Sequence, residues 1–60
     1  MDNDAYVGML REIIAEDELF VAENKNVIPM DEESAALLDR VLEAKRNLIE
    51  FKQLLKEATL

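Results

Sequence analysis

The sequence predicts an all-α protein, an antiparallel two-helix hairpin with helices at about residues 5–25 and 32–58. Apolar residues recur at helical spacing in both segments, and the chain's one proline lies between them. Composition agrees, because half of the residues are apolar, 35% are charged and only one is glycine, which is typical of a helical globular chain. Sixty residues predict a single domain, residues 1–60, with a small core and marginal stability.

The first predicted helix spans residues 5–25. Asp2, Asn3 and Asp4 precede it and offer capping oxygens, and negative charge suits the start of a helix. Its apolar side chains form one stripe, which consists of Tyr6, Val7, Leu10, Ile13, Ile14, Phe20 and Val21. Gly8 interrupts this stripe and weakens the helix by about 1 kcal/mol relative to alanine, so we expect close packing beside it.

The turn is predicted at residues 27–30. Lys25 and Asn26 are typical of a helix C-terminus, Asn26 because it tolerates left-handed backbone geometry. Pro29 cannot continue a helix, and it disfavours helical geometry in Ile28 before it. We expect the side chains of residues 27–30 to fold over the end of the hairpin.

The second predicted helix begins after Asp31, an N-cap residue followed by Glu32 and Glu33 in the first turn, where acids are favoured. A seam of apolar residues then alternates by four and three positions: Leu37, Val41, Ala44, Leu48, Phe51, Leu55 and Ala58. This heptad pattern is typical of coiled-coil pairing. It predicts that the helix packs lengthwise on the first one.

The second helix has more apolar surface than one neighbour covers. Four large side chains lie outside the seam, with Leu38, Leu42 and Ile49 on one flank and Leu54 on the other. A helix in a hairpin buries roughly three positions in seven, so these four would remain in water, and such a patch usually marks an interface. We expect either that two hairpins pair as a four-helix-bundle homodimer or that the patch docks on a different protein.

Asp17 is a polar residue in the middle of the first apolar stripe. A chain that folds back around Ile28 places Asp17 near Arg40, and Asn24 near Ser34. Such polar groups in a seam can fix the register and orientation of helices. The alternatives are an exposed position without a role and a contact with a partner.

The charge balance constrains the partners. Fourteen acids against seven bases give a formal charge of −7, which repels phosphate backbones and anionic lipid. We therefore expect no direct DNA or membrane binding and an attraction to a partner with a basic surface, oriented by Glu43, Glu50 and Glu57. Alternatively, the charge serves only solubility. A start without basic residues and the lack of a long apolar run predict a cytoplasmic protein.

Catalysis and cofactor binding are not expected. The chain has no histidine and no cysteine, the usual activators of nucleophiles and ligands of transition metals. Acids cluster at residues 16–18 and 31–33, but consecutive helical side chains diverge around the axis, whereas a hard cation needs converging oxygens. The sequence also contains no glycine-rich phosphate loop. We expect a protein that is not an enzyme and binds no cofactor or metal.

The expected function is therefore regulation or inhibition by protein–protein binding, as in antitoxins, anti-defence proteins and transcription-factor antagonists. The first alternative is a structural module that only oligomerises. The length and two-helix layout also resemble those of the small plasmid copy-number regulators, which dimerise as antiparallel hairpins. That resemblance implies a second alternative, an RNA-binding dimer, for which Lys45, Lys52 and Lys56 are the candidate phosphate contacts.

Overall fold

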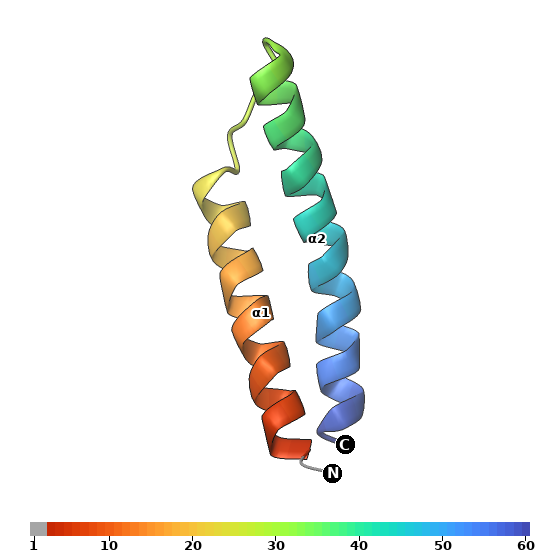
Figure 1. Cartoon of the computed structure of the whole chain (residues 1–60). Helices are drawn as coiled ribbons and strands as arrows, with labels where there is room; N and C mark the ends of the chain where they lie inside the picture. The colour runs from red at the N-terminus through yellow and green to blue at the C-terminus, as the bar shows by residue number, and fades with distance from the viewer. Residues whose placement is uncertain (1–2) are drawn as a thin grey trace.

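The structure, a computed structural model, describes residues 3–60 as two antiparallel helices, α1 (Asn3–Glu23) and α2 (Glu32–Ala58) (Figure 1). The helices pack along their length in an elongated body of 46 × 16 × 14 Å. The ends of the chain lie together at one end of the hairpin, and the loop lies at the other (Figure 1). The predicted all-α hairpin is confirmed, and the helix bounds agree with the expected ones within two residues.

The start of α2 is fixed by a reciprocal pair of capping hydrogen bonds. The Ser34 backbone N–H donates to Asp31 Oδ1 at 2.8 Å, and the Asp31 backbone N–H donates to Ser34 Oγ at 2.9 Å. Asp31 is therefore the N-cap, as predicted. The hydrogen bonds from the Ser34 backbone and side chain hold the pKa of the Asp31 carboxyl below its ordinary value, because they stabilise the charged form.

The end of α1 is closed by Asn24. Its side-chain Nδ2 donates to the carbonyl oxygen of Phe20 at 2.9 Å, and its backbone N–H bonds the same oxygen at 3.2 Å. The expected left-handed cap at Asn26 is wrong, since no residue from 3 to 60 has a positive φ angle. A side chain that satisfies a terminal carbonyl removes the need for such a cap.

A hydrogen bond joins the two helices at the open end of the hairpin. Asn3 Nδ2 donates to the carbonyl oxygen of Ala58 at 3.2 Å, so the first residue of α1 contacts the last residue of α2. The Asn3 side chain therefore bonds the other helix, whereas the sequence suggested that it could cap α1. Asp2, the other expected cap residue before Asp4, lies outside the described residues.

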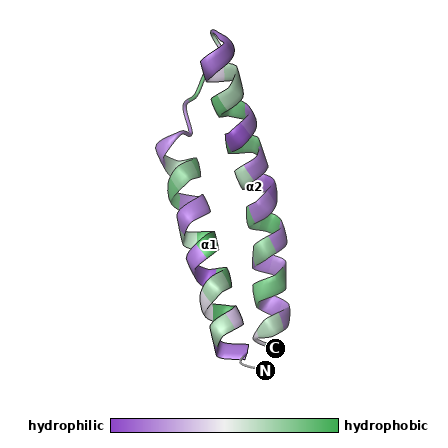
Figure 2. Cartoon of the chain, in the orientation of Figure 1, coloured by the Kyte–Doolittle hydropathy of each residue, from purple (hydrophilic) through white to green (hydrophobic). Residues whose placement is uncertain are grey.

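The core lies along the facing sides of the helices and is small. Figure 2 shows hydrophobic and hydrophilic residues alternating in bands along both helices, as an amphipathic pattern requires. Among residues 3–60, four hydrophobic residues are buried: Leu10, Ile14, Val41 and Ala44. The remaining seam residues of α2 are half-buried: Leu37, Leu48, Phe51, Leu55 and Ala58. The heptad seam therefore faces α1, as predicted, but it is only partly covered.

Two expectations about packing are wrong. The loop does not cover the end of the hairpin, because Ile28 is 69% exposed and Met30 is 85% exposed. Gly8 is not packed closely either, since a Cβ atom added there would meet nothing within 4 Å.

The register of the two helices differs from the expected one by about one helical turn. A fold-back around Ile28 would place Asn3 level with Leu54, whereas Asn3 contacts Ala58, four residues or about one turn further on. The cause is the loop, which runs over residues 24–31. Its path follows the first turns of α2, so that α2 extends beyond the end of α1 (Figure 1).

Candidate protein-interaction surfaces

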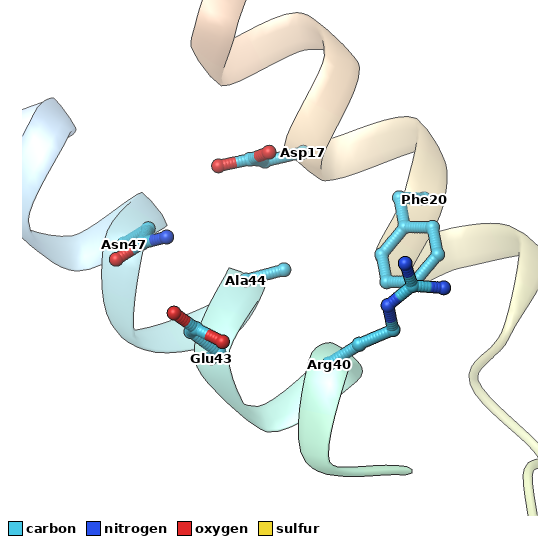
Figure 3. Close-up of a pocket in the computed structure, with 6 residues that line it drawn as sticks. All are labelled: Asp17, Phe20, Arg40, Glu43, Ala44 and Asn47. Carbon is cyan, nitrogen blue, oxygen red and sulfur yellow. The ribbon is translucent and has the colours of Figure 1, made fainter. Parts of the chain in front are cut away.

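The two long sides of the hairpin, where both helices meet solvent, differ in chemistry. One side contains a shallow hollow of about 360 Å³, lined by Asp17, Phe20, Arg40, Glu43, Ala44 and Asn47 (Figure 3). Elsewhere Lys52 Nζ lies 3.6 Å from Glu18 Oε2. Glu18 and Phe20 are two residues apart and so project about 160° from each other, which places this ion pair on the opposite side. We call the two sides the hollow face and the ion-pair face.

The hollow face continues along α1 as a row of large apolar residues. Residues seven apart lie on the same side of a helix, because they are separated by nearly two turns. Ile13 and Tyr6 precede Phe20 by seven and fourteen positions, and Met9 lies one turn from Ile13. Tyr6 and Met9 are exposed, and Ile13 is half-buried.

The same face continues along α2 towards the C-terminus. Leu54 follows Asn47 by seven residues, and Phe51 follows Ala44 by seven. Leu54 is exposed and Phe51 is half-buried. We define the apolar end of the hollow face as these two residues of α2 together with the α1 row, which comprises Tyr6, Met9 and Ile13. It lies towards the chain ends, beyond the hollow.

The hollow itself brings Asp17 and Arg40 together without pairing them. Asp17 is half-buried, and its carboxylate projects from α1 across the gap (Figure 3). Arg40 rises from α2 towards Phe20 instead (Figure 3), and no ion pair within 4 Å joins Arg40 to Asp17. The shift in register accounts for this, because it moves Asp17 about one turn along α2 from the expected level. The register-fixing role of Asp17 stays a prediction.

Asn24 and Ser34, the second expected polar pair, act locally. Asn24 bonds the Phe20 carbonyl at the end of α1, and Ser34 bonds Asp31 at the start of α2. No hydrogen bond joins the two side chains to each other.

The predicted apolar contacts of α2 divide between the two faces. Leu38 precedes Lys52 by fourteen residues and so lies on the ion-pair face, where it is half-buried. Leu42 and Ile49, spaced by seven, follow the outer edge of that face and are 49% and 74% exposed. Leu54 belongs to the hollow face, as shown above. The four residues therefore belong to two separate surfaces, Leu38, Leu42 and Ile49 to one and Leu54 to the other.

The glutamates predicted to orient a partner lie beside the hollow face. Glu43 lines the hollow, and Glu50 and Glu57 continue its row at intervals of seven, all exposed. Glu50 and Glu57 lie one turn before and after Leu54 on α2. By contrast, Leu42 and Ile49 have Lys45 between them at helical spacing, so basic groups border the outer edge of the ion-pair face.

Negative charge is concentrated on α1. Its 21 residues contain six acids and one base, a formal charge of −5, whereas α2 contains six acids and five bases, a charge of −1. Leu19 is exposed on the outer side of α1, and Glu16 and Glu23 lie one turn before and after it. Sequence reasoning missed Leu19 and Met9, because both fall outside the main stripe. Their size and helical spacing were the available signals.

The described residues give no group for metal chemistry and no membrane-spanning element. Between residues 3 and 60, no three acidic side chains gather as a metal ion would need. Within the same range, neither helix is long and apolar enough to cross a bilayer. Comparisons of the chain with protein-family models, with curated proteins and with solved structures returned no match.

Proposed function

We propose that this chain is a non-enzymatic regulatory or inhibitory protein of the cytoplasm. It acts as a homodimeric four-helix bundle that binds another protein with a basic surface. The observation that carries the proposal is the exposure of large apolar side chains on regular helices, above all Leu42 and Ile49. Full burial of a leucine or isoleucine side chain contributes about 1.5–3 kcal/mol. Covering these residues with a second protein would therefore supply a substantial part of a binding free energy.

The charge distribution supports a basic partner. The charge of −5 on α1 would attract a positive surface and raise the rate of encounter, an effect that falls with ionic strength. The apolar edge, formed by Leu38, Leu42 and Ile49, would then supply the contact area. The glutamate row at Glu43, Glu50 and Glu57, which lies on the same helix as this edge, would orient the partner.

A structural module that only oligomerises is the second candidate, and one observation favours it. The four residues buried within the described range form a small core, and small domains often depend on association for stability. RNA binding gains no comparable support, since the Lys52 ammonium group already contacts Glu18.

Affinity capture from a cell lysate tests the proposed function. The tagged wild-type chain should retain one basic protein in stoichiometric amount, and about 0.5 M salt should release it, because screening weakens charge attraction. Replacing the apolar edge residues in the variant Leu42→Asp/Ile49→Asp should abolish retention. Met30→Asp is the control, since Met30 is an apolar residue in the loop that is even more exposed than Leu42 and Ile49, and it should retain the protein. Retention that survives Leu42→Asp/Ile49→Asp would contradict the proposal.

A further inference from the structure

Within residues 3–60, the apolar end of the hollow face is only partly covered, since Tyr6, Met9 and Leu54 are exposed and Ile13 and Phe51 are half-buried. Its five side chains come from both helices and include the chain's tyrosine and one of its two phenylalanines. Aromatic residues and methionine are enriched in protein interfaces. The hollow beside it is lined by a carboxylate, Asp17, and a guanidinium group, Arg40, and neither makes an ion pair in the hairpin.

The exposed area of the hairpin matches the size of one interface. Its accessible surface is 4924 Å², whereas a compact monomer of 6.9 kDa exposes about 4,000 Å². The excess is therefore about 900 Å². A stable interface of standard size buries about 800 Å² on each partner. One face of this hairpin, covered by one partner, would account for the excess.

We propose that a second copy of this chain covers the hollow face, related by a twofold axis parallel to the helices. The inference deepens the proposed homodimer and rests on it, because it assigns the face, the symmetry and the contacts. In this arrangement α1 of each copy lies over α2 of the partner subunit. Every helix then has antiparallel neighbours, as in an up-and-down four-helix bundle.

This symmetry joins like surfaces at the same level. The hydrogen bond between Asn3 and Ala58 shows which ends of α1 and α2 are level within one hairpin. A twofold axis parallel to the helices keeps that level between copies, so the apolar end meets the apolar end and hollow meets hollow. Met9 of one copy then packs on Leu54 of the partner subunit, and the same contact occurs twice.

The charges in the hollow become complementary in the pair. Asp17 of one copy faces Arg40 of the partner subunit about one turn away, within reach of the long arginine side chain. Symmetry gives two such ion pairs in a partly buried site, where charge pairs are stronger than in water. Glu16, Glu43 and Glu50 oppose the pairing, and Glu43 lines the hollow itself. All three side chains are exposed, so solvent and salt screen their repulsion.

The ion-pair face does not fit a second copy. Three bases, Arg11, Lys45 and Lys52, lie along this face with one acid, Glu18, which already contacts Lys52. A twofold contact would therefore bring together an excess of basic groups. Like charges juxtaposed across an interface cost several kcal/mol. The pairing we propose leaves this face, and the apolar edge formed by Leu38, Leu42 and Ile49, free for a different protein.

A charge-swap experiment tests the inference. The variants Asp17→Arg and Arg40→Asp each place like charges at both symmetric contacts, so each alone should dimerise about 100-fold more weakly than the wild type. An equimolar mixture restores both ion pairs between unlike chains. Native mass spectrometry should therefore show the heterodimer as the main species, and far-UV circular dichroism should show that each variant remains helical when mixed.

The outcomes separate this inference from the proposed homodimer. A wild-type chain that stays at 6.9 kDa in analytical ultracentrifugation at all concentrations overturns both and leaves the hollow face to a different protein. A wild-type dimer whose two variants form no heterodimer overturns the inference alone. Glu18→Lys is the matched control on the ion-pair face, and it should leave the dimer intact. If Glu18→Lys dissociated the dimer and Asp17→Arg did not, the dimer contact would lie on the ion-pair face, and the inference would be overturned.

Discussion

Individual polar side chains determine where each helix begins and ends. Asp31 and Ser34 cap α2 reciprocally, and Asn24 closes α1 by bonding a terminal carbonyl. Sequence reasoning found Asp31, because an aspartate followed by acids is a strong start signal. It missed the role of Asn24. Asparagine can end a helix either by bonding a carbonyl four residues back or by adopting left-handed geometry, and the residue type does not distinguish the two.

Gly8 gives a direct test at this scale. A Cβ added at Gly8 would meet no atom within 4 Å, and alanine favours a helix over glycine by about 1 kcal/mol. We therefore expect Gly8→Ala to raise the free energy of unfolding by about 1 kcal/mol in urea denaturation. The control is Ala15→Gly, an exposed position on the same helix, which should lose a similar amount. No gain from Gly8→Ala would mean that a partner needs this position to be small.

The Asp31 cap predicts a pH dependence. The hydrogen bonds from Ser34 lower the pKa of Asp31 from its ordinary value of 3.8. The carboxylate's contribution is therefore fully present above pH 3.8 and is lost as the pH falls through the lower pKa of the folded state. Asn is an equally good cap that does not titrate, so Asp31→Asn is the control. The melting temperatures of the two proteins should agree above pH 3.8, and that of the wild type should fall below that of Asp31→Asn as the pH drops below 3.8. Parallel curves across this range would contradict the role of the carboxylate.

At the scale of elements, the heptad pattern was sufficient to predict the pairing of the helices but not their register. Periodicity identifies which side of each helix is buried, and the seam from Leu37 to Ala58 does face α1. Register depends instead on how many residues the loop uses, and residues 24–31 extend along α2 where a tighter turn was expected. The sequence contains no local signal for that path. The contact of Asn3 with Ala58 was unpredictable for the same reason.

Leu10 tests the packing between α1 and α2. It is 2% exposed, and truncation of a buried leucine to alanine costs about 2–5 kcal/mol. Since the whole core is small, Leu10→Ala should leave the chain largely unfolded at 25 °C by circular dichroism. Leu19→Ala is the control on the outer side of the same helix, where the side chain is exposed, and it should stay folded. Equal helicity of the two variants would contradict the observed packing.

At the scale of the whole molecule, charge and apolar surface are distributed unequally. Sequence reasoning recognised that Leu42, Ile49 and Leu54 exceed what a hairpin can cover. It did not find the hollow face, because the hollow and the apolar end combine side chains from both helices in a register that only the structure provides. The acidity of α1 could be predicted from the sequence. Where those acids lie relative to the basic side chains of α2 could not, because it depends on how the two helices pack.

The net charge predicts how salt acts on self-association. Each chain carries a formal charge of −7, and the Debye length falls from about 30 Å at 0.01 M salt to about 8 Å at 0.15 M. Screening should therefore reduce repulsion between copies and lower the dimer dissociation constant over this range. Analytical ultracentrifugation at both salt concentrations measures this change. A dissociation constant that rises with salt would mean that attraction between charges, and not apolar burial, holds the copies together.

We propose that a second polypeptide covers the exposed apolar surface of this hairpin, and that the hairpin becomes more stable when two copies associate. Thermal unfolding followed by circular dichroism over a hundredfold range of protein concentration tests this coupling. A folded state that contains two copies gains stability by mass action, so the melting temperature should rise steadily with concentration. A melting temperature independent of concentration, together with a monomer mass, would show that the hairpin is complete by itself and would contradict the claim.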